Sequence, residues 1–216
     1  MHRPPNLERK HKICVICEGY EDFAYFNRLL ELNVWNSAYE FYPINVKSAS
    51  NISARFQDVF QNDKYELILI FCDTDKSPYR EYIQVKQKIN GFFNKADAAE
   101  RLIIFANPCT MQIILSHFGE VSLKNQGKRT NSQKIEELTG VKGYDAHETQ
   151  IQEICRQIYK RTYEDMRSRV KAIRYSDETS GSTNFFTFLE HFENPSGEWI
   201  FEIKDYLKEE DHDQRS

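Results

Sequence analysis

Two short acidic clusters follow the most apolar segments of the chain, and their side chains are suited to chemistry at a bound cation. The first cluster is Glu18-Gly19-Tyr20-Glu21-Asp22, and the second is Asp73-Thr74-Asp75. Carboxylates that gather without a neighbouring cation repel one another, and a hard divalent cation such as Mg²⁺ relieves that repulsion because it prefers oxygen ligands. A cation held in this way supports chemistry on phosphate groups. Each cluster taken alone also suits an ordinary turn, since Asp and Gly are common turn residues.

The spacing of apolar residues predicts the elements that position these clusters. Short, continuously apolar runs are typical of strands buried on both faces, and spacings of three and four residues indicate helices. The pattern predicts strands at 13–17, 39–46, 67–72 and 102–106, and helices at 21–32, 49–61, 80–93 and 111–118. Strands that alternate with helices predict an α/β fold with a mostly parallel sheet flanked by helices. Neighbouring strands lie about 5 Å apart, so Glu18, Asp73 and Asp75 converge if their strands are adjacent.

The second half of the chain differs in composition from the first. Residues 124–134 are polar and basic and favour a loop, whereas 146–174 have helical character. A loop is predicted at 176–184 and a short aromatic helix at 185–192, and the acidic residues near the end suggest a flexible tail. We therefore predict an α/β core at 12–119, a mainly helical C-terminal extension at 120–208 and an acidic tail at 209–216.

The overall composition limits the function classes. The chain has 216 residues, 29 Lys and Arg, and 33 Asp and Glu, so its net charge of −4 excludes a uniformly basic nucleic-acid coat. Aromatic residues make up 13 %, which argues against disorder. We expect a cytoplasmic protein, because the sequence shows neither a secretory signal nor an apolar run of about 18 residues. The Cys14-x-x-Cys17 spacing suits a redox pair or half a zinc site, but its place in an apolar run favours core packing.

The arrangement of the two acidic clusters resembles a known family. A strand, Glu18-Gly19-x-x-Asp22 and a helix, followed by a strand and Asp73-x-Asp75, are similar to the TOPRIM domain of topoisomerases, primases and OLD-type nucleases. The segment from Asn107 to Phe118 resembles RloB-like proteins, which are small TOPRIM proteins of bacterial defence loci related to the TOPRIM nuclease of PARIS-type anti-phage systems. The TOPRIM resemblance covers roughly 12–119. The chain departs from the RloB-like pattern at Glu21-Asp22, where Thr-Glu is usual, and at 110–112, where an aromatic–acidic pair is usual.

This resemblance implies metal-dependent phosphodiester chemistry. Glu18 would act as general acid/base or bridging ligand, Asp73 and Asp75 would hold Mg²⁺ or Mn²⁺, and Asp22 would be a further ligand or orienting group. A topoisomerase or primase needs additional domains for which 216 residues leave no room, so an endonuclease acting on DNA or RNA, tRNA included, is the economical choice. The family context further implies an effector of anti-phage defence with an ABC- or AAA-type ATPase partner, and leaves a homodimer open.

Basic residues of the second half are candidates for binding nucleic acid. From 156 to 174 there are seven basic and two acidic residues, with Tyr159, Tyr163 and Tyr175 interleaved as candidate stacking platforms. The candidates in this phosphate track are Arg156, Lys160, Arg161 and Arg167. Lys128 and Arg129 would supply charge near the reacting phosphate or belong to a solvated loop. The alternative for the whole track is a solvated helix face. His117 follows an apolar helix and is predicted to be a satisfied core histidine.

Two other functions stay open at the level of the sequence. Residues 73–77 nearly match the Asp-x-Asp-x-Thr motif of haloacid dehalogenase-type phosphatases, in which the first aspartate, here Asp73, is a nucleophile. That motif normally opens the first strand of its domain, and here Glu18-Gly19 and two predicted helices precede it. The chain could instead be a catalytically degenerate TOPRIM module that serves as an interaction subunit of a defence complex.

Overall fold

A four-stranded, all-parallel sheet forms the centre of the protein, in the strand order β2-β1-β3-β4. The computed structural model describes residues 10–75, 78–173 and 175–209. Its strands are β1 (His11–Cys17), β2 (Tyr39–Asn45), β3 (Leu67–Asp73) and β4 (Ile103–Ala106). Its helices are α1 (Tyr20–Glu31), α2 (Ala49–Gln61), α3 (Arg80–Phe93), α4 (Ala98–Leu102), α5 (Met111–Leu115), α6 (Lys128–Thr139), α7 (Glu148–Arg156), α8 (Lys160–Ala172), α9 (Phe185–Glu193) and α10 (Glu198–Lys208). The predicted α/β class, with a parallel sheet flanked by helices and a mainly helical second half, is confirmed.

The two strands that precede the acidic clusters are neighbours. β1 pairs in parallel with β3 from Ile13↔Leu67 to Cys17↔Phe71, so the two strands end side by side. Both strands are almost completely buried, because helices cover both faces of the sheet, and this accounts for their continuously apolar sequences. β2 is an edge strand, which is where Pro43 is tolerated in a sheet.

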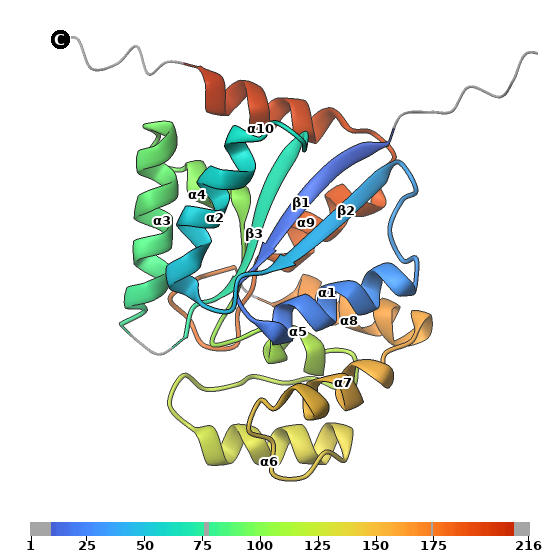
Figure 1. Cartoon of the computed structure of the whole chain (residues 1–216). Coiled ribbons are helices and arrows are strands. Elements are labelled where there is room, and N and C mark those ends of the chain that lie inside the picture. The colour runs from blue at the N-terminus through green and yellow to red at the C-terminus, as the bar shows by residue number, and fades with distance from the viewer. Residues whose placement is uncertain (1–9, 76–77, 174, 210–216) are drawn as a thin grey trace, which may run out of the picture.

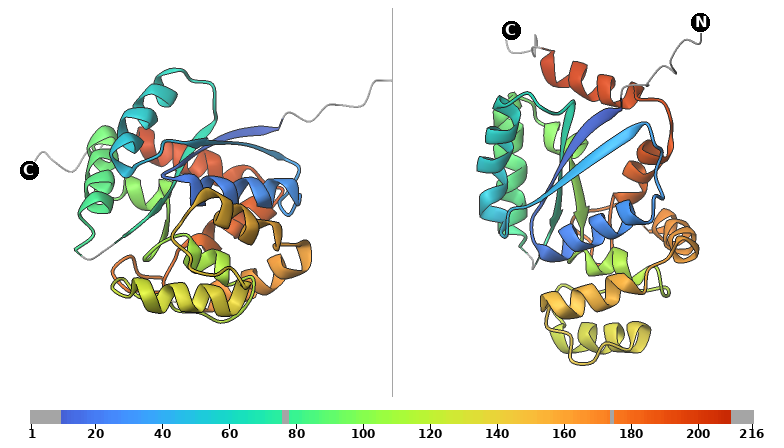
Figure 2. Two further views of the ribbon diagram at one scale, coloured as in Figure 1. Left: turned by 60° about the horizontal axis from the view of Figure 1, so that its bottom comes forward. Right: turned by 45° about the vertical axis from the view of Figure 1, so that its right-hand side comes forward.

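Helices from both halves of the chain cover the sheet (Figure 1). Helices α2, α3 and α4 lie on one face, and α1 and α9 on the other. On the second face the Phe71 and Phe185 rings stack with centroids 5.8 Å apart, and Phe26 packs edge-on against Phe192. Helix α10 lies across the end of the sheet where the strands begin, and α5, α6, α7 and α8 gather at the other end (Figures 1 and 2). Because the strands are parallel, that second group lies at their carboxyl ends, next to the acidic clusters.

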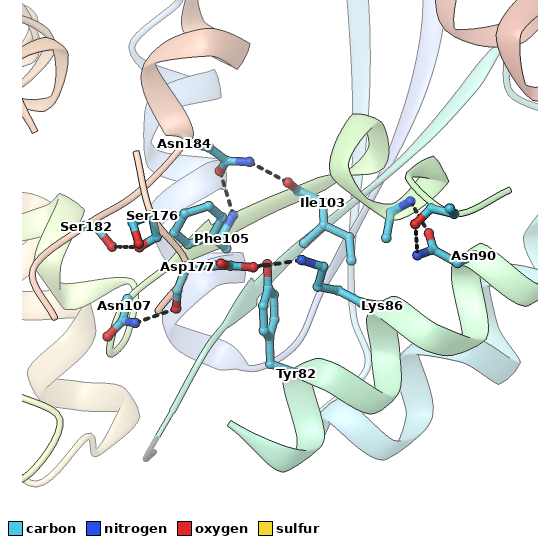
Figure 3. Close-up of polar contacts among 12 residues, drawn as sticks. Tyr82, Lys86, Asn90, Ile103, Phe105, Asn107, Ser176, Asp177, Ser182 and Asn184 are labelled. Atoms are coloured by element: carbon cyan, nitrogen blue, oxygen red, sulfur yellow. Dashed lines mark hydrogen bonds and ion pairs between the residues drawn. The ribbon is translucent and has the colours of Figure 1, made fainter. Parts of the chain in front are cut away.

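The loop predicted at 176–184 is irregular, as expected, but it is built into the sheet edge (Figure 3). The Asn184 side chain accepts a hydrogen bond from Phe105 N (2.8 Å) and donates one to Ile103 O (2.7 Å), so it pairs with the outer edge of β4. Asp177 accepts hydrogen bonds from Tyr82 (3.1 Å) and Lys86 (2.8 Å) of α3. The Asn184 contacts satisfy backbone groups of an edge strand that would otherwise be exposed.

Several predicted boundaries are wrong. The loop predicted at 124–134 is half helix, because α6 begins at Lys128 and buries Ile135 and Thr139 on an otherwise polar helix. The single helical stretch predicted at 146–174 is two helices, α7 and α8, separated by residues 157–159. Helix α5 ends at Leu115 and continues as turns, and α4 had no sequence signal of its own. Arg174 and residues 210–216 of the predicted tail lie outside the described residues. None of the described helices is long and apolar enough to cross a bilayer.

Candidate active site

Glu18 and Asp73 meet at the carboxyl ends of the two central strands. The backbone of Glu18 continues the pairing of β1 with β3, since its N–H donates to Phe71 O at 3.0 Å. Its side chain turns across the end of β3, where Oε2 accepts a hydrogen bond from Asp73 N at 3.1 Å. The convergence of these two carboxyl groups, expected only if the strands were neighbours, therefore follows from the register of the sheet.

Thr110 connects Asp73 with Asp22. Its N–H donates to Asp73 Oδ1 at 2.8 Å, and its hydroxyl contacts both Asp73 Oδ1 (3.1 Å) and Asp22 Oδ1. The Thr110 hydroxyl therefore lies between the two carboxyl groups, within hydrogen-bonding reach of both. Asp22 Oδ2 accepts from Gly19 N at 3.0 Å, which caps the first turn of α1. Asp22 is thus a buried link between the start of α1 and the metal candidate Asp73.

Glu21 also faces this cluster, which the sequence did not predict. Its Oε1 accepts a hydrogen bond from Met111 N at 2.7 Å, and its Oε2 accepts one from the hydroxyl of Tyr144. Glu21, Asp73 and Cys109 each bring one ligand atom into a group in which all these atoms lie within 4.8 Å of one another. Glu21 and Cys109 stand inside motifs that were already conspicuous in the sequence. Tyr144, in the segment between α6 and α7, had no such signal.

Asp75 lies at the exposed rim of the cluster. It follows β3 in a left-handed backbone conformation (φ 59°), and its N–H donates to Pro108 O at 2.9 Å. Its negative charge contributes to the raised pKa values of Glu18, Asp22 and Asp73. The structure therefore brings all four predicted carboxylates into one electrostatic group, with three of them inside and Asp75 outside.

The carboxyl groups of the cluster resist ionisation. Burial is the largest cause in each case, and it raises the pKa of Glu18 to about 8 and that of Asp22 to about 7. Burial and the charges of Asp22, Glu18, Glu21 and Asp75 raise the pKa of Asp73 well above its ordinary value. Within the described residues, no lysine or arginine forms an ion pair with Glu18, Glu21, Asp22 or Asp73. The cluster therefore offers oxygen donors whose mutual repulsion, when they are ionised, a divalent cation would relieve.

The loop that carries Cys109 and Thr110 is fixed from the other side by Asn107. The Asn107–Pro108 peptide bond is cis, and Asn107 Nδ2 donates to Asp177 O at 2.7 Å (Figure 3). Asn107 Oδ1 and Thr74 Oγ1 are buried oxygens that find no hydrogen-bond donor among the described residues. The loop is therefore held at Asn107 on one side and through Thr110 on the other. Thr74 Oγ1, between Asp73 and Asp75 in the sequence, is an uncommitted oxygen atom.

The basic candidates do not join the carboxylates and fall into separate groups. Lys128 is exposed at the start of α6 and pairs with Asp145 at 2.5 Å, beside the exposed Arg129. Arg167 lies between helices, where its Nε donates to the Glu193 carboxylate at 2.8 and 2.9 Å. The three other candidates, Arg156, Lys160 and Arg161, are exposed around the turn between α7 and α8.

Other side chains singled out in the sequence belong to the core. His117 is buried, bonds Tyr25 Oη (3.0 Å) and Thr162 Oγ1 (3.2 Å), and burial lowers its pKa to about 3, so the prediction of a satisfied core histidine is confirmed. Cys14 and Cys17 are free and buried in β1, three positions apart and therefore on opposite faces of the strand. That geometry suits core packing, and within the part of the chain that the structure describes neither cysteine belongs to a metal-binding group.

Comparison with known proteins identifies no relative of this chain. The chain matches no family model, no curated protein and no solved structure.

Proposed function

We propose that this protein is a metal-dependent nuclease that hydrolyses phosphodiester bonds of DNA or RNA. The observation that carries the proposal is the convergence of Glu18, Asp22 and Asp73 at the carboxyl ends of adjacent parallel strands, without a cationic partner among the described residues. In open α/β sheets this edge is where ligands bind. The sequence resemblance to TOPRIM nucleases supports the same reaction.

Glu18, Asp73 and Asp75 would hold Mg²⁺ or Mn²⁺, with Asp22 and Glu21 as adjacent oxygen donors. A divalent cation bound there would polarise a phosphate oxygen and stabilise the negative charge that develops on it. The protein's own groups keep the donors in place: Thr110 N fixes Asp73 Oδ1, Gly19 N fixes Asp22 Oδ2, and Met111 N fixes Glu21 Oε1. This preorganisation keeps mutually repelling carboxylates together in the absence of substrate.

Glu18 is the candidate general base. In the metal-free protein, burial and the charges of Asp22 and Asp75 raise the pKa of Glu18, so its carboxyl group accepts a proton more readily than an ordinary glutamate does. Its Oε2 is occupied by the hydrogen bond from Asp73 N, so Oε1 is the atom that would take the proton from an attacking water molecule. The same atom would return this proton to the leaving oxygen or to solvent.

The resemblance to RloB-like proteins supports a biological setting as well. We place this nuclease in the cytoplasm, as an effector of anti-phage defence controlled by an ABC- or AAA-type ATPase partner. The phosphatase alternative, with Asp73 as nucleophile, is less well supported, because four other acids and no described lysine surround that carboxyl group. A catalytically degenerate interaction subunit would keep the fold and lack the reaction.

A cleavage assay tests the proposal. The full chain is incubated with single- and double-stranded DNA and RNA and with tRNA, in Mg²⁺, Mn²⁺ or EDTA. We expect cleavage that requires the metal and falls at least about 100-fold in Glu18→Gln and Asp73→Asn. Glu66→Gln is the matched control, because Glu66 pairs with His11 at the opposite end of the sheet. Cleavage that survives both site variants would refute the assigned site. If every substrate remains intact, the isolated chain has no nuclease activity, which is the outcome that the interaction-subunit alternative predicts.

A further inference from the structure

One exposed tyrosine stands in a cluster of positive charge. Tyr159 begins α8, and its side chain is 59 % exposed although tyrosine usually buries most of its ring. Its backbone provides the helix cap, since Tyr159 N donates to Thr162 Oγ1 and Tyr159 O accepts from Tyr163 N, both at 3.0 Å. The ring has no part in these hydrogen bonds, so capping does not explain why an aromatic residue stands there.

One basic side chain contacts this ring, and three more are close to it in the sequence. Arg28 lies over it, with Cζ 6.0 Å from the ring centroid, and is held there by two hydrogen bonds to Ile158 O at 2.9 and 3.2 Å. Arg156, Lys160 and Arg161 are exposed beside it in the sequence, and none forms an ion pair with an acid of the described chain. Arg28 forms an ion pair with Glu31, in which Arg28 Nη1 lies 2.9 Å from Glu31 Oε2. We call these five side chains, Tyr159, Arg28, Arg156, Lys160 and Arg161, the Tyr159 patch.

The other predicted stacking platforms lack this environment. Tyr163 is 2 % exposed, and its hydroxyl donates to Glu193 at 2.6 Å, so it belongs to the core. Tyr175 is 58 % exposed, but its ring packs edge-on against Phe105, and the acids Glu100 and Asp177 contribute to its raised pKa. Among the tyrosines of the predicted track, Tyr159 alone has an exposed ring with an arginine lying over it.

Helix α1 connects the patch to the carboxylates. Glu21 and Asp22 stand in its first turn and Arg28 in its last, about 10 Å further along the axis. Helix α7 packs along the same helix, and Figure 1 shows the turn between α7 and α8 beside the far end of α1. The Tyr159 patch therefore lies about one helix length from the carboxylate cluster.

From these observations we infer that the Tyr159 patch binds unpaired nucleotides of the substrate strand, with a base stacked on Tyr159 and phosphates on Arg156, Lys160 and Arg161. A base offers its face to an aromatic ring only where it is unpaired, so stacking selects single strands over a duplex. The inference rests on the proposed nuclease function, because the closeness of the patch to the carboxylates matters only if a strand is held at those carboxylates.

Fluorescence anisotropy with a labelled oligonucleotide tests this inference apart from catalysis. Binding is measured in EDTA with Glu18→Gln protein, so that no cleavage occurs, using one DNA and one RNA oligonucleotide as single strands and as duplexes. We expect single strands to bind more tightly, and Tyr159→Ala to weaken single-strand binding by about 5- to 100-fold while Tyr159→Phe retains it. Arg161→Gln should lower the salt dependence of log K by about 0.7. Tyr175→Ala, with a ring of equal exposure, is the control and should bind like the parent.

The outcomes separate this inference from the proposed function. Equal binding by Tyr159→Ala and its parent, equal loss for duplexes and single strands, or no binding of any oligonucleotide would overturn the inference. Normal Tyr159-dependent binding together with absent cleavage would instead overturn the nuclease proposal and leave a single-strand-binding protein. Since Tyr159 is exposed, thermal melting should show the same folded state for the Ala, Phe and parent proteins.

Discussion

Replacing Glu18 with Gln should stabilise the metal-free protein at alkaline pH, although it removes the proposed general base. Burial and the charges of Asp22 and Asp75 raise the pKa of Glu18 from 4.5 to about 8. A carboxyl whose pKa is raised by folding binds its proton more tightly in the folded state than in the unfolded chain. Below about pH 4.5 it is neutral in both states and changes nothing, and between pH 4.5 and 8 the free energy of unfolding falls as the pH rises.

The size of this effect follows from the shift. A rise from 4.5 to about 8 corresponds to about 5 kcal/mol at 1.36 kcal/mol per unit, if Glu18 alone changes its protonation. Asp22 has a pKa of about 7 and shares the same repulsion, so part of the cost is relieved when Asp22 keeps its proton instead. We therefore expect Glu18→Gln to gain about 2–4 kcal/mol near pH 9. In a chain of 216 residues, a gain of 2 kcal/mol raises the Tm by about 4–8 °C.

Calorimetry in EDTA and in Mg²⁺ or Mn²⁺ measures the effect and its reversal. In EDTA the Tm of Glu18→Gln should exceed that of the wild type near pH 9 and equal it near pH 4.5. Added metal should raise the wild-type Tm more than that of the variant, because the metal removes the repulsion that the substitution already relieves. Glu66→Gln, at the far end of the sheet, should show neither pattern. A Tm for Glu18→Gln that lies below the wild type at both pH values would refute the electrostatic reasoning.

Three further predictions concern the residues that support the cluster and one that does not. Tyr144→Phe removes the hydroxyl that holds Glu21 and should lower the affinity for Mn²⁺ about 10-fold in isothermal titration calorimetry; unchanged affinity would show that Glu21 needs no such support. Cys109 lies among the acidic ligand atoms, so Cd²⁺ should produce a thiolate absorption band that Cys109→Ser lacks and Cys155→Ser keeps; no band in the wild type would exclude Cys109 as a donor. Arg167→Met breaks the ion pair with Glu193 and should lower the free energy of unfolding by about 1–3 kcal/mol in urea titrations, while the affinity for nucleic acid stays constant. Unchanged stability together with a loss of nucleic-acid affinity would show that Arg167 contacts phosphate instead.

The parallel sheet could be predicted because its strands carry a strong local signal. The runs ending at Cys17 and Cys72 are apolar without interruption, since both faces are covered, and no helix of similar length would need such a run. Helix α6 could not be predicted in the same way, because it buries few apolar residues and its sequence looks like a loop. Its helical state depends on tertiary contacts rather than on local preference.

The candidate site was predictable in part for the same reason. Glu18 and Asp73 directly follow strands, so the adjacency of the strands fixes their meeting point. The sequence does not show which way the first turn of α1 faces, and it therefore favoured Asp22 without revealing that Glu21 also points into the cluster. The contact between Glu21 and Tyr144 joins residues 123 positions apart, and only the folded chain brings them together.

Metal binding is the central claim, and a crystal structure of the protein soaked in Mn²⁺ tests it most directly. The anomalous signal of manganese locates the ion without reference to any assumed site. We predict a peak in contact with carboxylate oxygens of Glu18 and Asp73, at about 2.0–2.2 Å as expected for a small octahedral divalent cation. An empty carboxylate cluster in crystals that bind Mn²⁺ elsewhere would contradict the account.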